Sequence, residues 1–383
     1  MSLSEEYTDN FNRSDRNRHE NFRTSLSPGL TVLINRAPTT GQVTYSLSGS
    51  HDSSTDDINL FHSLLGQVSW QADPRLRLTA SDVLTRNDEP TLADQLSLRR
   101  ERQTFTSNTF SLTSEYLIAN ISTREYYRLA TFFNEDGVDT ISHTLGAGAS
   151  TSLYQANTAS LGYAYLLSQT SRGSDISGHQ VTASLARQLS SMASGGVAGS
   201  YAFRTATSSD AARETDFSIW AVSLFSAYAV PNTWSLSASI GFSRLESDHG
   251  GDTSSITTMT SFSYRFARAT ATLSVDQGFS ETFAEGENFG VVETRGVRGS
   301  LSYPFTPFIS GNTSVFYREN EFTGIGGGQA DRTEDTWGGS VSFSIQLLRW
   351  LNLGLDYTRT EGTSSRRGDF TENRARASLN AGF

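Results

Sequence analysis

Arginine is the residue type with the clearest chemical potential in this chain. All 30 basic residues are arginine. Its side chain is planar and permanently charged, and it binds carboxylates and phosphates through bidentate hydrogen bonds. Eight arginines occupy polar positions of segments in which polar and apolar residues alternate: Arg75, Arg77, Arg124, Arg128, Arg265, Arg298, Arg318 and Arg376. Asp276 and Asp356 occupy the same positions, with Asp82 as a further candidate. The set predicts a cationic wall that favours anionic solutes. The alternative is a wall whose arginines are neutralised by neighbouring carboxylates and carbonyls.

Residues for catalysis or metal binding are missing from the sequence pattern. The 6 histidines are scattered without the spacing of a ligand pair, and no G-x-S-x-G elbow occurs. There is no cysteine, which excludes thiolate metal sites, cysteine nucleophiles and disulfides. We therefore expect no metal, no cofactor and no enzymatic activity.

The elements that must position the arginines are long alternating segments. Trp234, Leu236 and Ile240 face one way, while the serines between them face the other. A period of two residues predicts β-strands with one apolar and one polar face. These segments run to about 10–14 residues, longer than the strands of soluble sheets and long enough for a tilted strand to cross a bilayer. No apolar run is long enough for a membrane-spanning helix.

The connections between these segments alternate between two kinds. Very short turns such as 37–40, 73–74 and 230–232 contain most of the 7 prolines. The intervening connections, such as 52–57 and 246–252, are longer and acidic or glycine-rich. Short periplasmic turns and longer extracellular loops are typical of outer-membrane barrels, and aromatic residues near the segment ends resemble their interfacial girdles.

The predicted fold is all-β: a transmembrane antiparallel up-and-down β-barrel of about twenty strands, an even number as in bacterial single-chain barrels. Eighteen strands is the alternative, since the first strand and the 88–102 connection are the least regular. We expect a single domain over 1–383 without a plug domain, and connections too short to fold inwards. The expected strands are 2–10, 20–36, 41–52, 58–72, 75–87, 103–117, 120–133, 139–154, 158–170, 176–189, 195–207, 216–229, 233–246, 254–266, 269–282, 290–303, 307–322, 334–347, 350–360 and 371–383.

The two ends of the chain carry expectations about location. The segment from Met1 lacks the basic and apolar regions of a signal peptide, so we expect a mature chain after signal removal, placed in the bacterial outer membrane. The alternating stretch that ends on Phe383 resembles the C-terminal signature read by the barrel-assembly machinery. The expected partners are therefore this machinery, the lipid bilayer and lipopolysaccharide. The net charge of −10 argues against nucleic acid as a partner.

Several short motifs resemble the beta-barrel porin family that accompanies exosortase (PEP-CTERM) and exopolysaccharide gene clusters. They are Glu5-Glu6-Tyr7-Thr8-Asp9-Asn10, Leu26-Ser27-Pro28-Gly29-Leu30, the strand around Tyr45, and 81–88. The resemblance implies an outer-membrane barrel linked to polysaccharide export, and it supplies no catalytic residues. A periplasmic export partner is expected on a separate ground, because a wide barrel without a plug must be open, flattened or closed by a partner.

The functional hypothesis from the sequence is a non-enzymatic outer-membrane conduit for exopolysaccharide or another hydrophilic polymer, acidic polymers included. A general porin for small solutes is one alternative. A structural barrel that encloses a partner protein is another. An outer-membrane hydrolase and a soluble β-repeat protein are the weakest alternatives.

Overall fold

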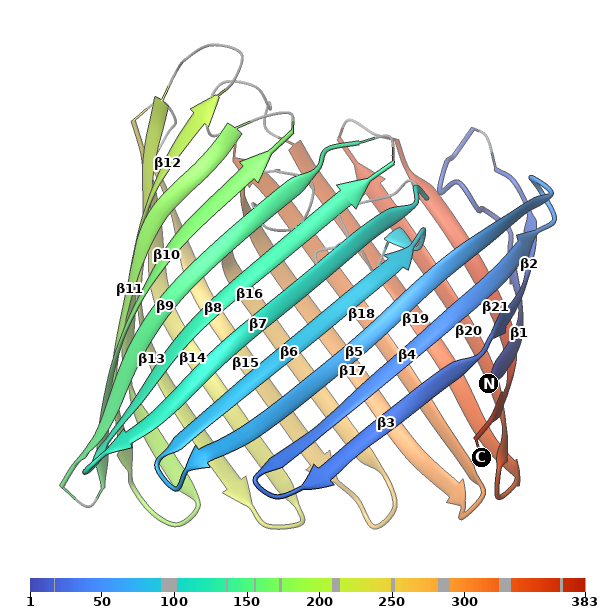
Figure 1. The fold of residues 1–383 in the computed structure, drawn as a ribbon. Helices are drawn as coiled ribbons and strands as arrows, with labels where there is room; N and C mark the ends of the chain where they lie inside the picture. The colour runs from blue at the N-terminus through green and yellow to red at the C-terminus, as the bar shows by residue number, and fades with distance from the viewer. Residues whose placement is uncertain are drawn as a thin grey trace.

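A computed structural model describes residues 1–16, 18–90, 102–135, 137–154, 156–171, 174–208, 214–248, 252–281, 290–323, 332–365 and 368–382. Antiparallel strands wind into one closed wall, with both chain ends near the edge that carries the short turns (Figure 1). Among the described residues, no helix is long and apolar enough to cross a membrane.

The strands are β1 (Ser2–Thr8), β2 (Asn21–Ser27), β3 (Gly29–Arg36), β4 (Thr39–Asp52), β5 (Asp57–Asp73), β6 (Leu76–Asn87), β7 (Phe105–Ile118), β8 (Ile121–Asn134), β9 (Thr140–Leu153), β10 (Asn157–Thr170), β11 (Ser174–Gln188), β12 (Ala193–Ser208), β13 (Glu214–Val230), β14 (Trp234–Ser247), β15 (Thr253–Arg265), β16 (Thr270–Glu281), β17 (Val291–Thr306), β18 (Ile309–Thr323), β19 (Arg332–Leu348), β20 (Leu351–Ser364) and β21 (Phe370–Ala381).

β2 and β3 are two parts of one strand. Both pair with β4 in one continuous register, from Arg23↔Asp52 through Gly29↔Ser46. Pro28 separates them because proline has no backbone N–H to give to the ladder, although its carbonyl still accepts a hydrogen bond from the amide of Leu47. Counted as one, they leave twenty strands in the ring, which confirms the predicted fold class and count.

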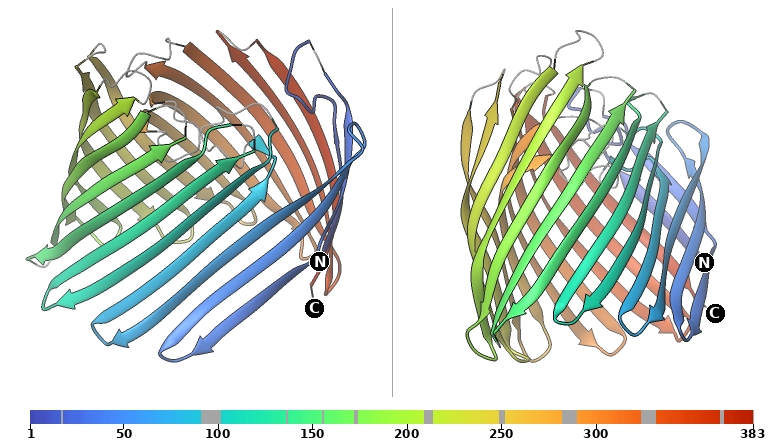
Figure 2. Two further views of the ribbon diagram at one scale, coloured as in Figure 1. Left: turned by 45° about the horizontal axis from the view of Figure 1, so that its top comes forward. Right: turned by 60° about the vertical axis from the view of Figure 1, so that its left-hand side comes forward.

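The ring closes between the first and the last strand. β1 and β21 pair antiparallel from Ser2↔Asn380 to Thr8↔Arg374. Every other strand pairs with its neighbours in the chain, and Figure 2 shows the resulting tilted wall from two further directions. Closure leaves the wall without free edges over most of its circumference, as a membrane-spanning sheet requires.

The two faces of the wall differ as the alternation predicts. Directly paired residues of antiparallel strands share a face, so the pairs Tyr45↔Leu64 and Trp70↔Leu78 define an apolar outer face. Asp82 lies on that outer face as well, because within β6 it is an even number of residues from Leu78 and from Leu84, the partner of Leu64. The expectation that Asp82 points inwards is therefore wrong: unbroken alternation through β6 groups it with the leucines.

Candidate functional site: the lumen and its mouth

Paired hydroxyl groups cover much of the inner face. Ser160 and Ser184 lie 2.6 Å apart through their Oγ atoms, and Ser314 and Ser340 lie 2.8 Å apart. Each pair bridges neighbouring strands because paired residues of an antiparallel sheet lie directly opposite one another. Small hydroxyl side chains leave space inside the ring, so the inner face is polar and suited to water.

The structure places the arginines of the sequence analysis on or beside this inner face. Arg77, Arg124, Arg128, Arg298, Arg318 and Arg376 lie within strands in the inward register, and Asp276 and Asp356 share it. Arg265 is the last residue of β15, and Arg75 lies in the turn between β5 and β6. Phe383 lies outside the described residues, so its role as an assembly signal stays a prediction.

These inward arginines lie among acidic and aromatic residues. Arg77 and Arg124 both pair in register with Glu115, and Arg376 pairs with Asp356. An Arg318 guanidinium nitrogen lies 3.8 Å from an Asp276 carboxylate oxygen. Opposite charges therefore lie close to one another along the inner wall. Among the inward residues predicted from the sequence, arginines outnumber aspartates.

A buried ionic cluster occupies the loop end of the lumen near β1, β6 and β21. Arg13 Nε lies 2.8 Å from a Glu372 oxygen, and Arg13 Nη2 lies 3.1 Å from Glu89. Arg102 contacts the same two carboxylates, that of Glu89 at 2.8 Å and that of Glu372 at 3.2 Å. Arg374 adds a contact of 3.0 Å to Glu89. The side chains of Arg102 and Glu372 are each only 3% exposed. The segments 9–16 and 88–90 thus fold inwards and join onto the inner face of β21.

Burial and charge oppose each other at Arg102, which lies outside the strands. Burial alone would lower its pKa, but the nearby carboxylates of Glu89 and Glu372 raise it above the ordinary value. The guanidinium therefore keeps its charge, and the cluster depends on matched charges in a place that water hardly reaches.

A second group of charges extends the same cluster towards β4. Arg23 lies 2.7 Å from Asp52 and 2.6 Å from Asp88. The ring of Phe11 lies 5.5 Å from the Arg23 guanidinium and 4.8 Å from that of Arg102, within cation–π range. Phe11 therefore packs between the Arg23 group and the Arg102 group of the cluster and holds the segment 9–16 against both.

An apolar cluster occupies the loop end on the opposite side of the ring. Ile176, Phe217 and Leu245, from the inner faces of β11, β13 and β14, pack with Val291 of β17, and Phe279 of β16 packs against them. Leu245 and Val291 are 0% exposed. Because β16 and β17 are not neighbours of β11 or β13 in the ring, their upper ends must lean across the lumen.

Gly278 is where β16 leaves the wall. The β15–β16 ladder ends at Thr258↔Gln277, whereas the β16–β17 ladder continues to Glu281↔Val291. Gly278 has a φ of 154°, a backbone conformation that residues other than glycine rarely adopt. Beyond it, the face that pointed outwards now meets the inner wall, and Arg204 of β12 bonds Glu281 at 3.1 Å.

The expectation that no segment narrows the lumen is therefore wrong. Loop lengths were the basis of that expectation, but 278–281 and 291–294 are strand residues rather than loop residues. The residues of the ionic cluster were not found from the sequence, because Arg13, Glu89 and Arg102 lie in irregular segments. Arg204 could have been found, since it alternates in the same register as Ser200.

A mixed-charge pocket of about 440 Å³ lies directly beneath the ionic cluster. Its lining includes Ser4, Glu6, Ser25, Asp356 and Arg376, so two of the residues singled out from the sequence take part. Arg376 pairs in register with both Glu6 and Asp356. The pocket offers both hydrogen-bond donors and acceptors to a polar solute that enters the lumen.

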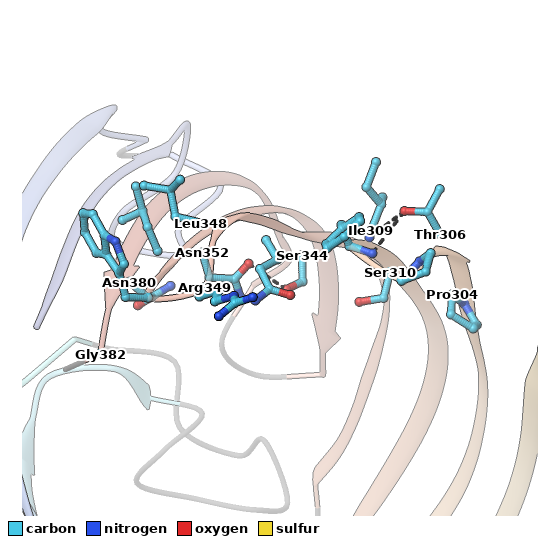
Figure 3. Close-up of a pocket in the computed structure, with 15 residues that line it drawn as sticks. Pro304, Thr306, Ile309, Ser310, Ser344, Leu348, Arg349, Asn352, Asn380 and Gly382 are labelled. Carbon is cyan, nitrogen blue, oxygen red and sulfur yellow. Dashed lines mark hydrogen bonds between the residues drawn. The ribbon is translucent and has the colours of Figure 1, made fainter.

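A further pocket of about 500 Å³ marks the opposite, short-turn end of the lumen. Figure 3 shows its lining from the turns beside Thr306 and Arg349, together with Ser344, Asn352 and Asn380 of the inner face. An Asn352 amide nitrogen donates to Ser344 Oγ at 2.9 Å. This end is polar as well, so the lumen presents hydrophilic groups from one mouth to the other.

No cluster of three or more histidine, cysteine, aspartate or glutamate residues with a metal-binding arrangement occurs within the described parts of the chain. The fold is a closed antiparallel β-barrel whose inner face carries charged and hydroxyl side chains.

No protein-family model and no curated protein matches this chain. Among solved structures, it is similar to the FrpB iron transporter from Neisseria meningitidis, with 10% identity and a TM-score of 0.58 over 100% of this chain and 81% of that one. The ferric enterobactin receptor of Pseudomonas aeruginosa gives 11% identity and a TM-score of 0.53 over 100% and 81%. Pseudomonas aeruginosa OccK5 gives 13%, a TM-score of 0.49, and coverage of 100% and 97%. At these identities the first two similarities establish the barrel fold alone.

Proposed function

We propose that this protein is a non-enzymatic outer-membrane pore for hydrophilic solutes of limited size, with a preference for anions. The observation that carries the proposal is the polar lumen narrowed at one mouth by two buried, inward-folded elements. A side-chain-filled barrel would transport nothing, whereas rings of this size leave an aqueous lumen. The inward elements then set an upper limit on solute size.

The anion preference rests on the charges that line the wall. Arg128 and Arg298 face the lumen with no salt bridge recorded for either among the described residues. Arginines along a pore favour anions by lowering their electrostatic barrier. The acidic residues on the same face weaken this preference, so we expect modest rather than strict selectivity.

Planar-bilayer recording and liposome swelling test the proposal. We expect stable conductance, a reversal potential in a KCl gradient that indicates chloride preference, and swelling with monosaccharides that fades for longer oligosaccharides. A purified, folded barrel without conductance would refute the pore. Cation preference would refute the charge argument alone.

A conduit for an extended polysaccharide is the second candidate. It is supported by the resemblance to the exosortase-associated porins and by the hydroxyl rows, which offer many weak hydrogen bonds to a moving sugar chain. Its test is the same swelling series extended to linear acidic oligosaccharides. Entry of long linear oligomers, with exclusion of branched ones of equal mass, would favour the conduit over the small-solute pore.

A further inference from the structure

A row of alternating charges crosses four neighbouring strands in the pocket beneath the ionic cluster. Glu6 of β1 pairs in register with Arg23 of β2 on one side and with Arg376 of β21 on the other. Arg376 pairs in turn with Asp356 of β20, which lies beside β21 in Figure 1. All four side chains line the pocket. The inner wall therefore presents positive and negative groups in alternation, one strand spacing of about 4.8 Å apart.

The arginine at one end of this row is already neutralised. Arg23 lies 2.7 Å from Asp52 and 2.6 Å from Asp88, so both of its salt bridges belong to the ionic cluster above the pocket. Its side chain is only 10% exposed. Arg23 therefore ends the row on the β2 side, and its charge is directed away from Glu6.

The other three charged groups face the pocket without neutralising one another. Arg376 Nη2 donates to Ser4 Oγ at 3.3 Å, and among the described residues Arg376 forms no salt bridge with Glu6 or Asp356. Ser4 lies two residues from Glu6 towards the short-turn end, so the guanidinium is directed along β1 rather than at the carboxylate beside it. Arg376 and Asp356 are exposed to the lumen. The row thus holds an accessible cation between two carboxylates.

This arrangement favours a solute that carries charges of both signs. A simple anion at Arg376 would meet a carboxylate on either side, and a simple cation at Asp356 or Glu6 would meet Arg376. The two carboxylates lie two strand spacings, or about 10 Å, apart, so a small cation cannot contact both. A solute with an ammonium group and a carboxylate contacts an opposite charge at each end, and both contacts are charge-assisted hydrogen bonds.

We propose that this pocket is a binding site for small zwitterionic solutes, the chemical class of the neutral amino acids. Arg376 binds the carboxylate of the solute, and Asp356 or Glu6 accepts hydrogen bonds from its ammonium group. The pocket volume of about 440 Å³ holds one such solute together with water.

The position of the pocket makes the site a step in permeation, and in this respect the proposal rests on the pore function. Glu89 and Arg374 line the pocket and also belong to the ionic cluster that narrows the mouth. A solute that passes this narrowing therefore meets the row of charges next. Because a zwitterion has no net charge, the site recognises a class of solute that the anion preference of the wall does not select.

Four solutes of matched shape test the class of ligand: alanine is a zwitterion, lactate an anion, alaninamide a cation and lactamide neutral. Each is titrated against the purified barrel, with binding followed by saturation-transfer NMR in detergent micelles and by the decrease in single-channel conductance. We expect alanine to bind about tenfold more tightly than each of the others, because it alone makes both charged contacts. Alanine binding no tighter than that of any other member of the set would overturn the proposal.

Substitutions that leave charges of one sign test the row itself. Arg376→Gln leaves the two carboxylates, so alaninamide should then bind more tightly than alanine. Glu6→Gln combined with Asp356→Asn leaves the cation, so lactate should become the tightest ligand. Arg298→Gln is the control, since it removes a lumen guanidinium outside this pocket and should keep the preference for alanine. An unchanged order of affinities in both pocket variants would overturn the proposal.

The two measurements separate this site from the pore function. Binding in micelles does not require conductance, so tight alanine binding without any conductance would refute the pore while the binding site stands. Stable conductance with equal binding of the four solutes would refute the site while the pore stands.

Discussion

The two inward-folded elements narrow the same mouth of the lumen by opposite chemistry. On one side, the ionic cluster joins Arg13 and Arg102 to Glu89 and Glu372, which are buried beneath the loops. On the other side, the apolar cluster holds the ends of β16 and β17 against Phe217 and Leu245. Burial of a charge is tolerated only with its partner in place, whereas an apolar contact weakens gradually as atoms are removed.

This difference predicts how each side fails. The ionic side is bound by few groups that depend on one another, so loss of Glu372 leaves Arg13 and Arg102 to share the single carboxylate of Glu89, which Arg374 also contacts. The apolar side is bound by many contacts that act independently, and its failure should be partial. The following substitutions test this contrast, from the largest expected effect to the smallest.

Glu372→Gln should have the largest effect. It removes the carboxylate shared by Arg13 and Arg102, and a buried pair broken on one side loses about 3–5 kcal/mol. We expect a lower thermal midpoint of the folded barrel in gel-shift assays, together with larger or noisier conductance. Glu361→Gln is the matched control on β20, since its pair with Arg359 lies on the outer face, where Glu361 is 23% and Arg359 50% exposed. An equal effect of both substitutions would remove the argument from burial.

Leu245→Ala should destabilise the barrel by about 3 kcal/mol, within the range for a fully buried leucine. The side chain is 0% exposed and lies at the centre of the apolar cluster. Leu236→Ala, on the outer face of the same strand, is the control. Because only contacts and not charges are lost, the effect should vary little with salt. A strong salt dependence would contradict the apolar account of this side.

Glu281→Gln should destabilise the barrel less, by about 2 kcal/mol, as expected for a charged hydrogen bond with one partly exposed partner. It weakens the link to Arg204, whose side chain is 4% exposed. Arg204→Met combined with Glu281→Gln should lose less than the sum of the single substitutions. Simple additivity in this double-mutant cycle would show that the two side chains do not stabilise each other.

Arg128→Ser should leave stability nearly unchanged and alter only selectivity. It removes a cation from the inner wall away from both clusters, so the reversal potential in a salt gradient should shift towards that of a non-selective pore. Arg187→Ser is the control, because Arg187 pairs opposite Asn157 on the outward register. A similar shift with both variants would mean that general surface charge, rather than the lumen, sets selectivity.

Much of this architecture could be predicted from the sequence. The strands follow from a period of two residues, and the expected range 20–36 matches the interrupted β2–β3 strand, with Pro28 in its middle. The inward register of Arg298 and Asp356 follows from the same alternation, because within each strand the polar residues lie on one face and the apolar residues on the other. Asp82 was misplaced only where that alternation was not followed through Leu78 and Leu84.

The narrowing of the mouth was decided by the tertiary structure alone. Arg13 and Glu372 are 359 positions apart in the chain, and Arg204 and Glu281 are 77 apart. A local pattern reports which face of a strand is apolar, but not whether its end follows the wall or leans across the lumen. Whether a strand end leans across the lumen depends on the side chains that it would contact on the opposite wall. Those side chains are distant in the sequence, and only the closed ring brings them together. Local alternation thus determined the barrel, and contacts across its interior determined how far it is open.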